Sequence, residues 1–167
     1  SFDLSADGYV NLLPANKKHS RMPGDNREMV AARTRFLNAG YYQLFSSRIN
    51  ELTAKILGQT AVPAPAIADF GCGEGYYTAR LFDFLRSSGQ APQMVGMDIS
   101  KFAVRTAAKR NHAVLWAVAN AFSSPLFESS IDFILSIFAP SDSSEFRRVL
   151  KDGGYVLAAC PGAKHLW

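Results

Sequence analysis

The sequence has little cysteine, histidine and charge. Its 167 residues include two cysteines and three histidines, and charged residues make up 19%. Two cysteines are too few for a disulfide-bonded scaffold, so we expect a reducing, cytoplasmic location. No apolar run approaches the roughly 20 residues that a membrane-spanning helix needs, so we expect no membrane partner.

What the chain does have is apolar side chains to bury. Hydrophobic residues make up 48% of it. That proportion excludes an intrinsically disordered chain and is enough for a real core in a single domain of this length. The formal net charge of +4 is modest.

The character of the sequence changes at about residue 60. Residues 1–60 predict an irregular segment followed by two helices, one capped by Asp25 or Asn26 and one from about Tyr41 to Leu57. Helical spacing predicts one apolar stripe on each helix. These are Met29, Ala32, Phe36 and Leu37 on the first, and Leu44, Phe45, Ile49, Leu52 and Ile56 on the second.

Residues 61–167 alternate short apolar runs with helical stretches, which predicts an α/β fold with a mostly parallel sheet covered on both faces. Such a sheet often has six or seven strands, so five strands predict a piece of a longer protein. The five expected strands are Ala66–Phe70, Gln93–Asp98, Ala113–Val118, Ile131–Phe138 and Tyr155–Cys160. The expected helices are Tyr76–Arg86, Lys101–Arg110 and Ser143–Leu150.

A glycine-rich loop between the first of these strands and its helix is the strongest functional signal. It reads Asp69-Phe70-Gly71-Cys72-Gly73-Glu74-Gly75. Glycines there allow a tight turn and a close approach of the backbone to a ligand. Asp98 ends the next strand, where a carboxylate can accept both hydroxyls of a ribose. The alternative is a turn that only connects strand to helix.

The loop favours S-adenosyl-L-methionine over a dinucleotide. Tyr76 stands where a dinucleotide-binding loop would have its third glycine. The acids Asp69 and Glu74 would repel a pyrophosphate, but they suit a cofactor that carries an amino acid and a sulfonium. We therefore predict a Rossmann-like class I S-adenosylmethionine-dependent methyltransferase fold.

Three further residues end predicted strands on the ligand side of the sheet. Asn120 is placed to hydrogen-bond an adenine edge, although capping a loop explains it as well. Phe138 is expected near the transferred methyl group. Cys160 could be a nucleophile for carbon methylation, but a structural cysteine at a strand end is the better interpretation.

Several segments resemble the bacterial large-subunit rRNA guanine-N1-methyltransferases of the RlmA type, over essentially the whole chain. The glycine loop is shared by many methyltransferases, and the other segments are more specific. They are Phe2-Asp3, Gly8-Tyr9-Val10-Asn11-Leu12-Leu13, Ser20-Arg21-Met22-Pro23-Gly24-Asp25, Ala31-Ala32-Arg33, Phe36-Leu37-Asn38-Ala39-Gly40-Tyr41-Tyr42, Ala107-Ala108-Lys109-Arg110, Pro161-Gly162 and His165-Leu166.

The resemblance implies methyl transfer to N1 of a guanine in a hairpin loop of 23S rRNA. It implies that Gly73 and Glu74 contact the cofactor and that Tyr42 and His165 flank it, beside the Asp69, Gly71, Gly75 and Asp98 of the loop signal. It also implies a zinc module just before Phe2, whose ligands are expected to be absent from this chain, and a longer C-terminal part. Residues 1–60 would then border the active site, and residues 61–167 would form the cofactor domain.

Methyl transfer to guanine N1 also needs a route for the N1 proton and a surface for the base. Asp142 and Asp25 are the candidate proton acceptors, and Phe138 or Tyr9 the candidate stacking partner. Basic side chains near the specific segments are candidates to contact RNA phosphates: Lys17, Lys18, Arg21, Arg33 and Arg35. A second basic group is better explained as a solvated helix face: Lys101, Arg105, Lys109 and Arg110.

Two other functions stay open at this point. A small-molecule methyltransferase would explain the loop and Asp98 but leave the N-terminal segment unexplained. A domain that holds cofactor or RNA without turnover is the other. The sequence also leaves a homodimer open.

Overall fold

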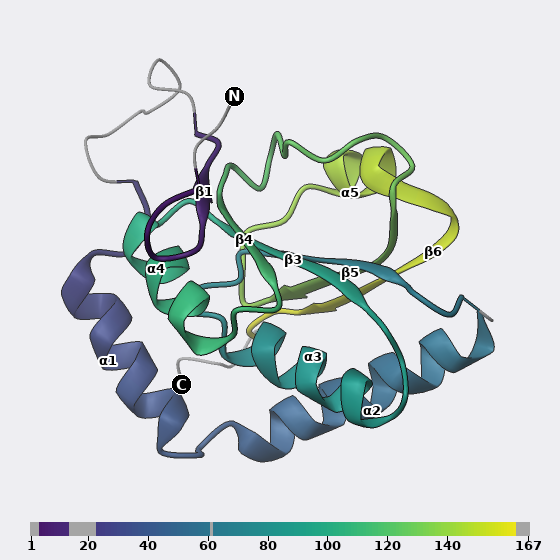
Figure 1. The fold of residues 1–167 in the computed structure, drawn as a ribbon, viewed down its shortest axis with the longest axis horizontal. Coiled ribbons are helices and arrows are strands. Elements are labelled where there is room, and N and C mark those ends of the chain that lie inside the picture. The colour runs from purple at the N-terminus through teal and green to yellow at the C-terminus, as the bar shows by residue number, and fades with distance from the viewer. Residues whose placement is uncertain (1–3, 14–22, 61, 163–167) are drawn as a thin grey trace.

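The computed structural model describes residues 4–13, 23–60 and 62–162 and shows one six-stranded, wholly parallel sheet (Figure 1). The strand order is β1-β4-β3-β2-β5-β6. The strands are β1 Val10–Asn11, β2 Ala66–Phe70, β3 Gln93–Asp98, β4 Leu115–Val118, β5 Ile131–Ile137 and β6 Leu150–Ala159. The helices are α1 Arg27–Asn38, α2 Gln43–Gln59, α3 Tyr76–Ser87, α4 Lys101–Arg110 and α5 Ser143–Val149.

The predicted alternation of strands and helices is confirmed, but the count of five strands is wrong. β1 adds a sixth, which pairs with β4 through Val10 opposite Ala117 and Asn11 opposite Val118. Its two residues are too few to show the periodic pattern by which a strand is recognised in a sequence. This strand makes residues 10 and 11 the edge of the same sheet that the later strands form.

Helices cover the two faces of the sheet unequally. On one face, α3 and α4 pack on the strands and α2 packs on α3; on the other face lies α5 (Figure 1). Strand residues alternate between the two cores. Ile67 of β2 joins the core beneath α3 and α4, and Ala68 joins the core beneath α5. The alternation therefore turns Asp69 toward α3 and Phe70 toward α5.

The expected apolar stripes of α1 and α2 are wrong in detail. In α1 the buried residues are Val30 and Leu37, whereas Met29 and Phe36 are about half exposed. In α2 the side chains of Leu44 and Leu52 are exposed. The face of α2 that packs on α3 is largely polar instead: Ser46, Ile49, Asn50, Thr53 and Leu57 are buried.

Hydrogen bonds satisfy part of the polar face that is buried between α2 and α3, whereas Asn50 Oδ1 and Thr53 Oγ1 have no partner among the described residues. Arg80 of α3 donates through Nε to Ser46 Oγ at 2.8 Å and through Nη2 to Ser47 Oγ at 3.4 Å. Asn50 Nδ2 donates to the carbonyl oxygen of Arg80 at 3.3 Å. Polar groups that find partners can be buried at little cost, and hydrophobic periodicity does not detect them.

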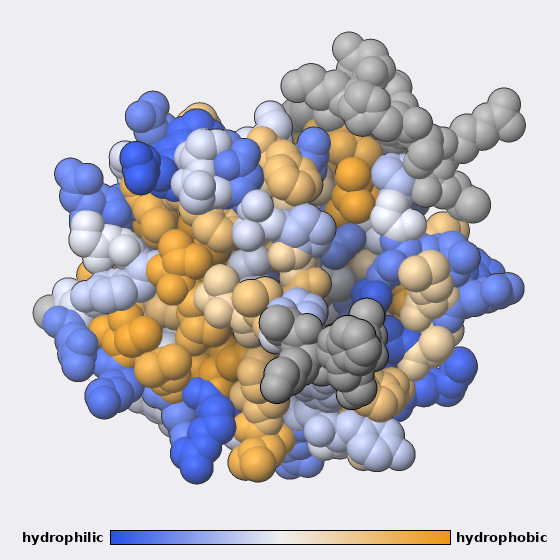
Figure 2. Space-filling view, turned by 180° about the vertical axis from the view of Figure 1, so that it is seen from behind, coloured by the Kyte–Doolittle hydropathy of each residue, from blue (hydrophilic) through white to orange (hydrophobic). Residues whose placement is uncertain are grey.

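β6 forms one edge of the sheet and is largely exposed. Tyr155 and Val156 in it keep about two fifths of their surface exposed. The view from behind shows a broad apolar area on that side of the molecule (Figure 2). Among the described residues, no helix combines the length and hydrophobicity that a membrane span needs.

Candidate functional site

The glycine loop is held at the carboxyl end of β2 by bonds to β3. The backbone N–H groups of Gly71 and Cys72 both donate to the carbonyl oxygen of Met97, at 2.8 and 2.9 Å. The N–H of Gly73 donates to Asp98 Oδ2 at 3.0 Å. The two predicted halves of the site, the loop and the acid after the next strand, therefore lie in direct contact.

Two of the loop glycines are required by close packing as well as by a left-handed backbone. Gly71 has φ 77°, and a Cβ there would lie 2.3 Å from Ala139 Cβ, just past β5. Gly75 has φ 78°, and a Cβ there would lie 2.8 Å from both Ala107 Cβ and the Trp116 ring. A side chain at either position would push the loop away from the sheet.

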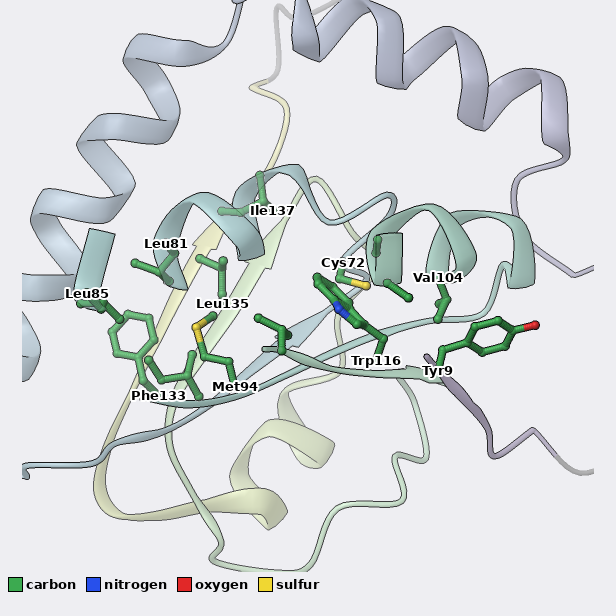
Figure 3. Close-up of a cluster of buried hydrophobic side chains, with 14 of the residues drawn as sticks. Tyr9, Cys72, Leu81, Leu85, Met94, Val104, Trp116, Phe133, Leu135 and Ile137 are labelled. Carbon is green, nitrogen blue, oxygen red and sulfur yellow. The ribbon is translucent and has the colours of Figure 1, made fainter. Parts of the chain in front are cut away.

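Cys72 is a packing residue of the loop. Its buried thiol lies in the core beside the Trp116 indole (Figure 3). Burial raises the pKa of the thiol well above its usual range, so it stays protonated. Gly96 lies beneath both side chains, since a Cβ there would approach the Trp116 ring to 2.4 Å.

Asp69 lies beneath the loop with one oxygen unpartnered. Its side chain is 2% exposed, and Oδ2 accepts from Thr78 Oγ1 at 2.5 Å. Oδ1 is buried with no hydrogen-bond partner among the described residues. Burial raises the pKa of the carboxyl to about 7, and the charges of Asp98 and Glu74 add to the increase. A buried acceptor without a donor can accept a hydrogen bond from a cationic ligand group.

Asp98 and Glu74 add two more acids with raised pKa values. Asp98 accepts from Gly73 N and, through Oδ1, from Ser100 N at 2.8 Å, and burial raises its pKa. Each carboxylate oxygen has a second lone pair, so two ribose hydroxyls can still be accepted. Burial also raises the pKa of Glu74, while the charges of Arg110 and Arg33 oppose that increase.

The buried Glu74 carboxylate lies beside Arg110. Glu74 is 3% exposed, and its carboxylate lies 3.5 Å from Arg110 Nη2, which is too long for a good hydrogen bond. Arg110 Nε donates to the carbonyl oxygen of Glu74 at 3.1 Å, and its guanidinium lies over the Tyr76 ring.

The segment before α1 forms a wall beside Asp98. Ser100 Oγ donates to the carbonyl oxygen of Asp25 at 2.6 Å. Gly24, at φ 79°, lies so close that a Cβ would come within 2.8 Å of Ile99 Cγ2. Asp25 forms an ion pair with Arg33 of α1. Residues far apart in the sequence thus converge on the glycine loop.

Aromatic rings form a cluster at the start of α2 and the end of β5. Phe138 stacks on Phe45 with ring centroids 5.6 Å apart and meets Tyr42 edge-on at 6.0 Å. Phe138 has φ 54° and is 43% exposed. A left-handed backbone is unfavourable for phenylalanine, and such strain is common at functional sites. Tyr42 and Phe138 were predicted separately, and the fold brings them together.

The remaining predicted residues have varied positions. Asn120 Oδ1 accepts from Phe122 N at 2.9 Å, so it caps a turn, and its amide NH2 group is left to donate to a ligand. Asp142 caps α5, and its bonds to Ser144 lower its pKa. Tyr9 is wrong as a base-stacking residue because it is 5% exposed and belongs to the core (Figure 3). Cys160 is exposed at the end of β6.

Four predicted residues lie outside the described part of the chain: Lys17, Lys18, Arg21 and His165. Of the second basic group, Arg105 and Lys109 pair with Asp7, and Arg110 bonds to Glu74 and Asn38. These contacts favour the interpretation of that group as a structural helix face.

Two features of the site are not visible in the sequence. Arg33, expected as a contact of RNA phosphates, lies close to Gly73 of the loop, and Phe45, expected on a helix stripe, stacks on Phe138. No local pattern could have found either, because both depend on the path of the chain between α1 and α2.

The donor set fits a cofactor with cationic groups. Three acids with raised pKa values surround a glycine loop, and two of them, Asp69 and Glu74, each have a buried oxygen with no hydrogen-bond partner among the described residues. A bound ammonium or sulfonium would stabilise their charged forms, whereas a pyrophosphate would be repelled. Within the described ranges, no group of three or more potential metal ligands occurs.

Two family models match the chain. One, described as a methyltransferase domain, matches residues 67–154. The other, described as the N-terminal part of RlmA, a zinc ribbon, matches residues 1–21. The second match reaches further along the chain than the position before Phe2 that the resemblance implied.

Curated relatives agree with these matches. A 23S rRNA (guanine(748)-N(1))-methyltransferase of Streptomyces fradiae is 32% identical over 99% of this chain and 56% of its own length. A protein of Micromonospora griseorubida, named for 23S rRNA (guanine-N(1)-)-methyltransferase activity, is 34% identical over 99% of this chain and 58% of its own. The chain thus spans a little over half the length of these relatives.

Solved structures show the same fold at low sequence identity. An S-adenosyl-L-methionine-dependent methyltransferase structure from Methanococcus maripaludis has a TM-score of 0.64 at 18% identity, covering 84% of this chain and 68% of its own. A TehB-like methyltransferase from Corynebacterium glutamicum has a TM-score of 0.59 at 22% identity, covering 84% and 75%. The predicted Rossmann-like fold is confirmed.

Proposed function

The chain belongs to the methyltransferase domain family, and from that premise we propose that it is the cofactor-binding part of an S-adenosylmethionine-dependent enzyme that methylates N1 of a guanine in a hairpin loop of 23S rRNA. The observation that carries the target is the identity of 32–34% to curated rRNA guanine-N1-methyltransferases along 99% of this chain. The cluster of acids around the glycine loop supports the cofactor.

The residues proposed to hold the cofactor come from three strand ends. Asp98 would accept the ribose hydroxyls, the backbone of the Gly71–Gly75 loop would pass beneath the cofactor, and Asp69 would meet the ammonium. Asn120 would face the adenine with its amide NH2 group. Tyr42 and Phe138 would border the reacting end, and His165 remains a predicted neighbour outside the described residues.

S-adenosylmethionine supplies an electrophilic methyl group, and the protein has to align the guanine with it. A guanine in a single-stranded loop can leave its stack at modest cost and be held on an aromatic ring. We propose Phe138 as that ring. It is 43% exposed, and its stack on Phe45 fixes its orientation. Residues 1–60 would then border the active site of the domain formed by residues 61–167.

The N1 proton needs an acceptor, and Asp142 and Asp25 remain the proposed candidates. The lowered pKa of Asp142 makes it a weak base, and Asp25 is occupied by Arg33. The test compares the variants Asp142→Asn and Asp25→Asn, made separately, for methyl transfer and for cofactor affinity. If both retain full methyl transfer with unchanged cofactor affinity, neither side chain accepts the proton.

A labelling experiment tests the proposed function. The protein is incubated with labelled S-adenosylmethionine and with rRNA from cells that lack the modification, and the methylated base is mapped. We expect label at guanine N1, lost in Asp98→Asn and kept in Asp152→Asn, which changes an exposed acid of β6. Label found only in small molecules, or cofactor binding without transfer, would overturn the rRNA target.

Three basic residues that are expected to contact RNA lie outside the described part of the chain. Lys17, Lys18 and Arg21 are proposed to contact RNA phosphates, so their replacement by alanine should weaken salt-dependent RNA binding. RNA binding that survives the triple replacement would exclude this assignment. A cytoplasmic location and a homodimer remain predictions.

A further inference from the structure

Arg33 is a cation that faces the glycine loop from outside the methyltransferase domain. It lies on α1, whereas the domain match begins at residue 67. A Cβ built on Gly73 would lie 3.9 Å from Arg33 Nη1. The charge of Arg33 also opposes the increase that burial causes in the pKa values of Glu74 and Asp98. The guanidinium is therefore close to the two acids that flank the loop.

The position of Arg33 is fixed by the segment that precedes its helix. The Asp25 carboxylate forms an ion pair with Arg33 Nη1, and the backbone carbonyl oxygen of Asp25 accepts a hydrogen bond from Ser100 Oγ. Ser100 is buried at the start of α4, directly after Asp98 and Ile99. A chain of contacts thus runs from the end of β3 through Asp25 to the guanidinium.

The proposed cofactor carries a group that a cation at this place can bind. Its amino-acid end carries an α-carboxylate as well as an ammonium, and the acids Asp69, Glu74 and Asp98 would repel that carboxylate. An arginine compensates because its planar fork donates two parallel hydrogen bonds to a carboxylate. Within the described ranges Arg33 uses only Nη1 for Asp25, which leaves further N–H groups to donate.

Arg110, the other arginine near the loop, is poorly placed for that role. Its Nε and Nη1 donate to the carbonyl oxygen of Glu74 and to Asn38 Oδ1, and its guanidinium covers the Tyr76 ring. Its side chain is 22% exposed, against 45% for Arg33. Arg110 therefore supports the loop from behind.

We propose that Arg33 binds the α-carboxylate of S-adenosylmethionine and that Asp25 holds the guanidinium over the loop for this purpose. The inference rests on the proposed use of that cofactor. It assigns a selective role to the N-terminal segment: adenosine-containing compounds without an amino-acid carboxylate do not engage Arg33.

The test compares two ligands on one variant. S-adenosylhomocysteine has the carboxylate, whereas 5′-methylthioadenosine has the same adenosine and sulfur without the amino acid. We expect Arg33→Met to weaken S-adenosylhomocysteine binding by about ten-fold or more, in line with hydrogen bonds to charged groups, and to leave the Kd of 5′-methylthioadenosine unchanged. Isothermal titration calorimetry measures both.

Arg86→Met is the matched control, since Arg86 is an exposed arginine near the end of α3, and it should leave both affinities unchanged. An equal loss for both ligands in Arg33→Met would overturn the inference, because it would indicate damage to the loop. So would an unchanged Kd for S-adenosylhomocysteine. If the unsubstituted protein binds neither ligand, the proposed cofactor itself is wrong, which is a distinguishable failure.

Discussion

Asp69 joins the glycine loop to α3, and its burial links stability to pH. Its pKa of about 7 in the folded protein exceeds the ordinary value of 3.8 because burial disfavours the charged form. Between these two values the folded protein binds more protons than the unfolded chain. Stability is therefore greatest below the ordinary pKa, falls as the pH rises through about 4 to about 7, and levels off above.

We expect Asp69→Asn to flatten this dependence. Asparagine keeps an acceptor for Thr78 but does not ionise. The urea midpoint of the Asp69→Asn variant should therefore change less between about pH 5 and about pH 8 than the midpoint of the unsubstituted protein. Glu51→Gln, which changes an exposed acid of α2, should leave the pH profile as it was. If the stability of Asp69→Asn depends on pH as steeply as that of the unsubstituted protein, other groups cause the pH dependence.

Phe138 combines an exposed ring with an unfavourable backbone, which suits a residue selected for contact with substrate. We expect Phe138→Ala to reduce methyl transfer to rRNA by about ten-fold or more, since stacking of one base contributes roughly 1–3 kcal/mol. The Kd of S-adenosylhomocysteine should change little. Single-turnover rates and calorimetry measure the two effects.

The control for this substitution is Phe127→Ala, because Phe127 is 84% exposed on the connection between β4 and β5. Removing its ring should not alter the transfer rate. Equal loss in both variants, or loss of cofactor affinity in Phe138→Ala alone, would contradict a stacking role for Phe138.

At the scale of elements, the loop and the start of α3 depend on how closely α4 and β4 approach them. Gly75 caps α3 with a left-handed backbone directly against Ala107 and Trp116. We expect Gly75→Ala to lower the free energy of unfolding by about 2–4 kcal/mol, from backbone strain together with overpacking. Chemical denaturation measures the loss.

Gly89→Ala separates the two causes. Gly89 has φ 82° but no atom within 4 Å of an added Cβ, so only the strain of about 1 kcal/mol should remain. If the two substitutions cost the same, close packing does not explain the requirement for glycine at Gly75.

At the scale of the whole molecule, ligand binding should stabilise the entire sheet. The site takes residues from the ends of β2 and β3, which are central strands, so a ligand bound there opposes global unfolding. A ligand at a hundred times its Kd adds about 2.7 kcal/mol to the free energy of unfolding. S-adenosylhomocysteine should therefore raise the Tm of the protein by several degrees.

The Asp98→Asn variant provides the comparison. It keeps the size of the side chain and its hydrogen bond from Gly73 but loses the charge, so the same ligand concentration should raise its Tm far less. The shift should be retained in Asp152→Asn. An unchanged shift in Asp98→Asn would remove Asp98 from the proposed cofactor site.

The periodic patterns of the chain alone predict most of the α/β sheet and its glycine loop. β2, β3 and α4 have the predicted bounds, because buried parallel strands and an amphipathic helix leave periodic patterns in the chain. The glycine loop and Asp98 were also visible, since the loop is contiguous and the acid ends the following strand. Both signals are local, and the parallel arrangement then places strand ends together.

The surroundings of that loop depend on tertiary contacts. Arg33 over Gly73, Phe45 on Phe138 and the polar face of α2 all arise from contacts between distant segments. β1 is likewise visible only through its pairing with β4. Such contacts depend on how helices pack and how their polar groups find partners. Hydrophobic periodicity predicts neither. The few cysteines and modest charge excluded whole classes of protein, but the placement of individual charges came from the fold.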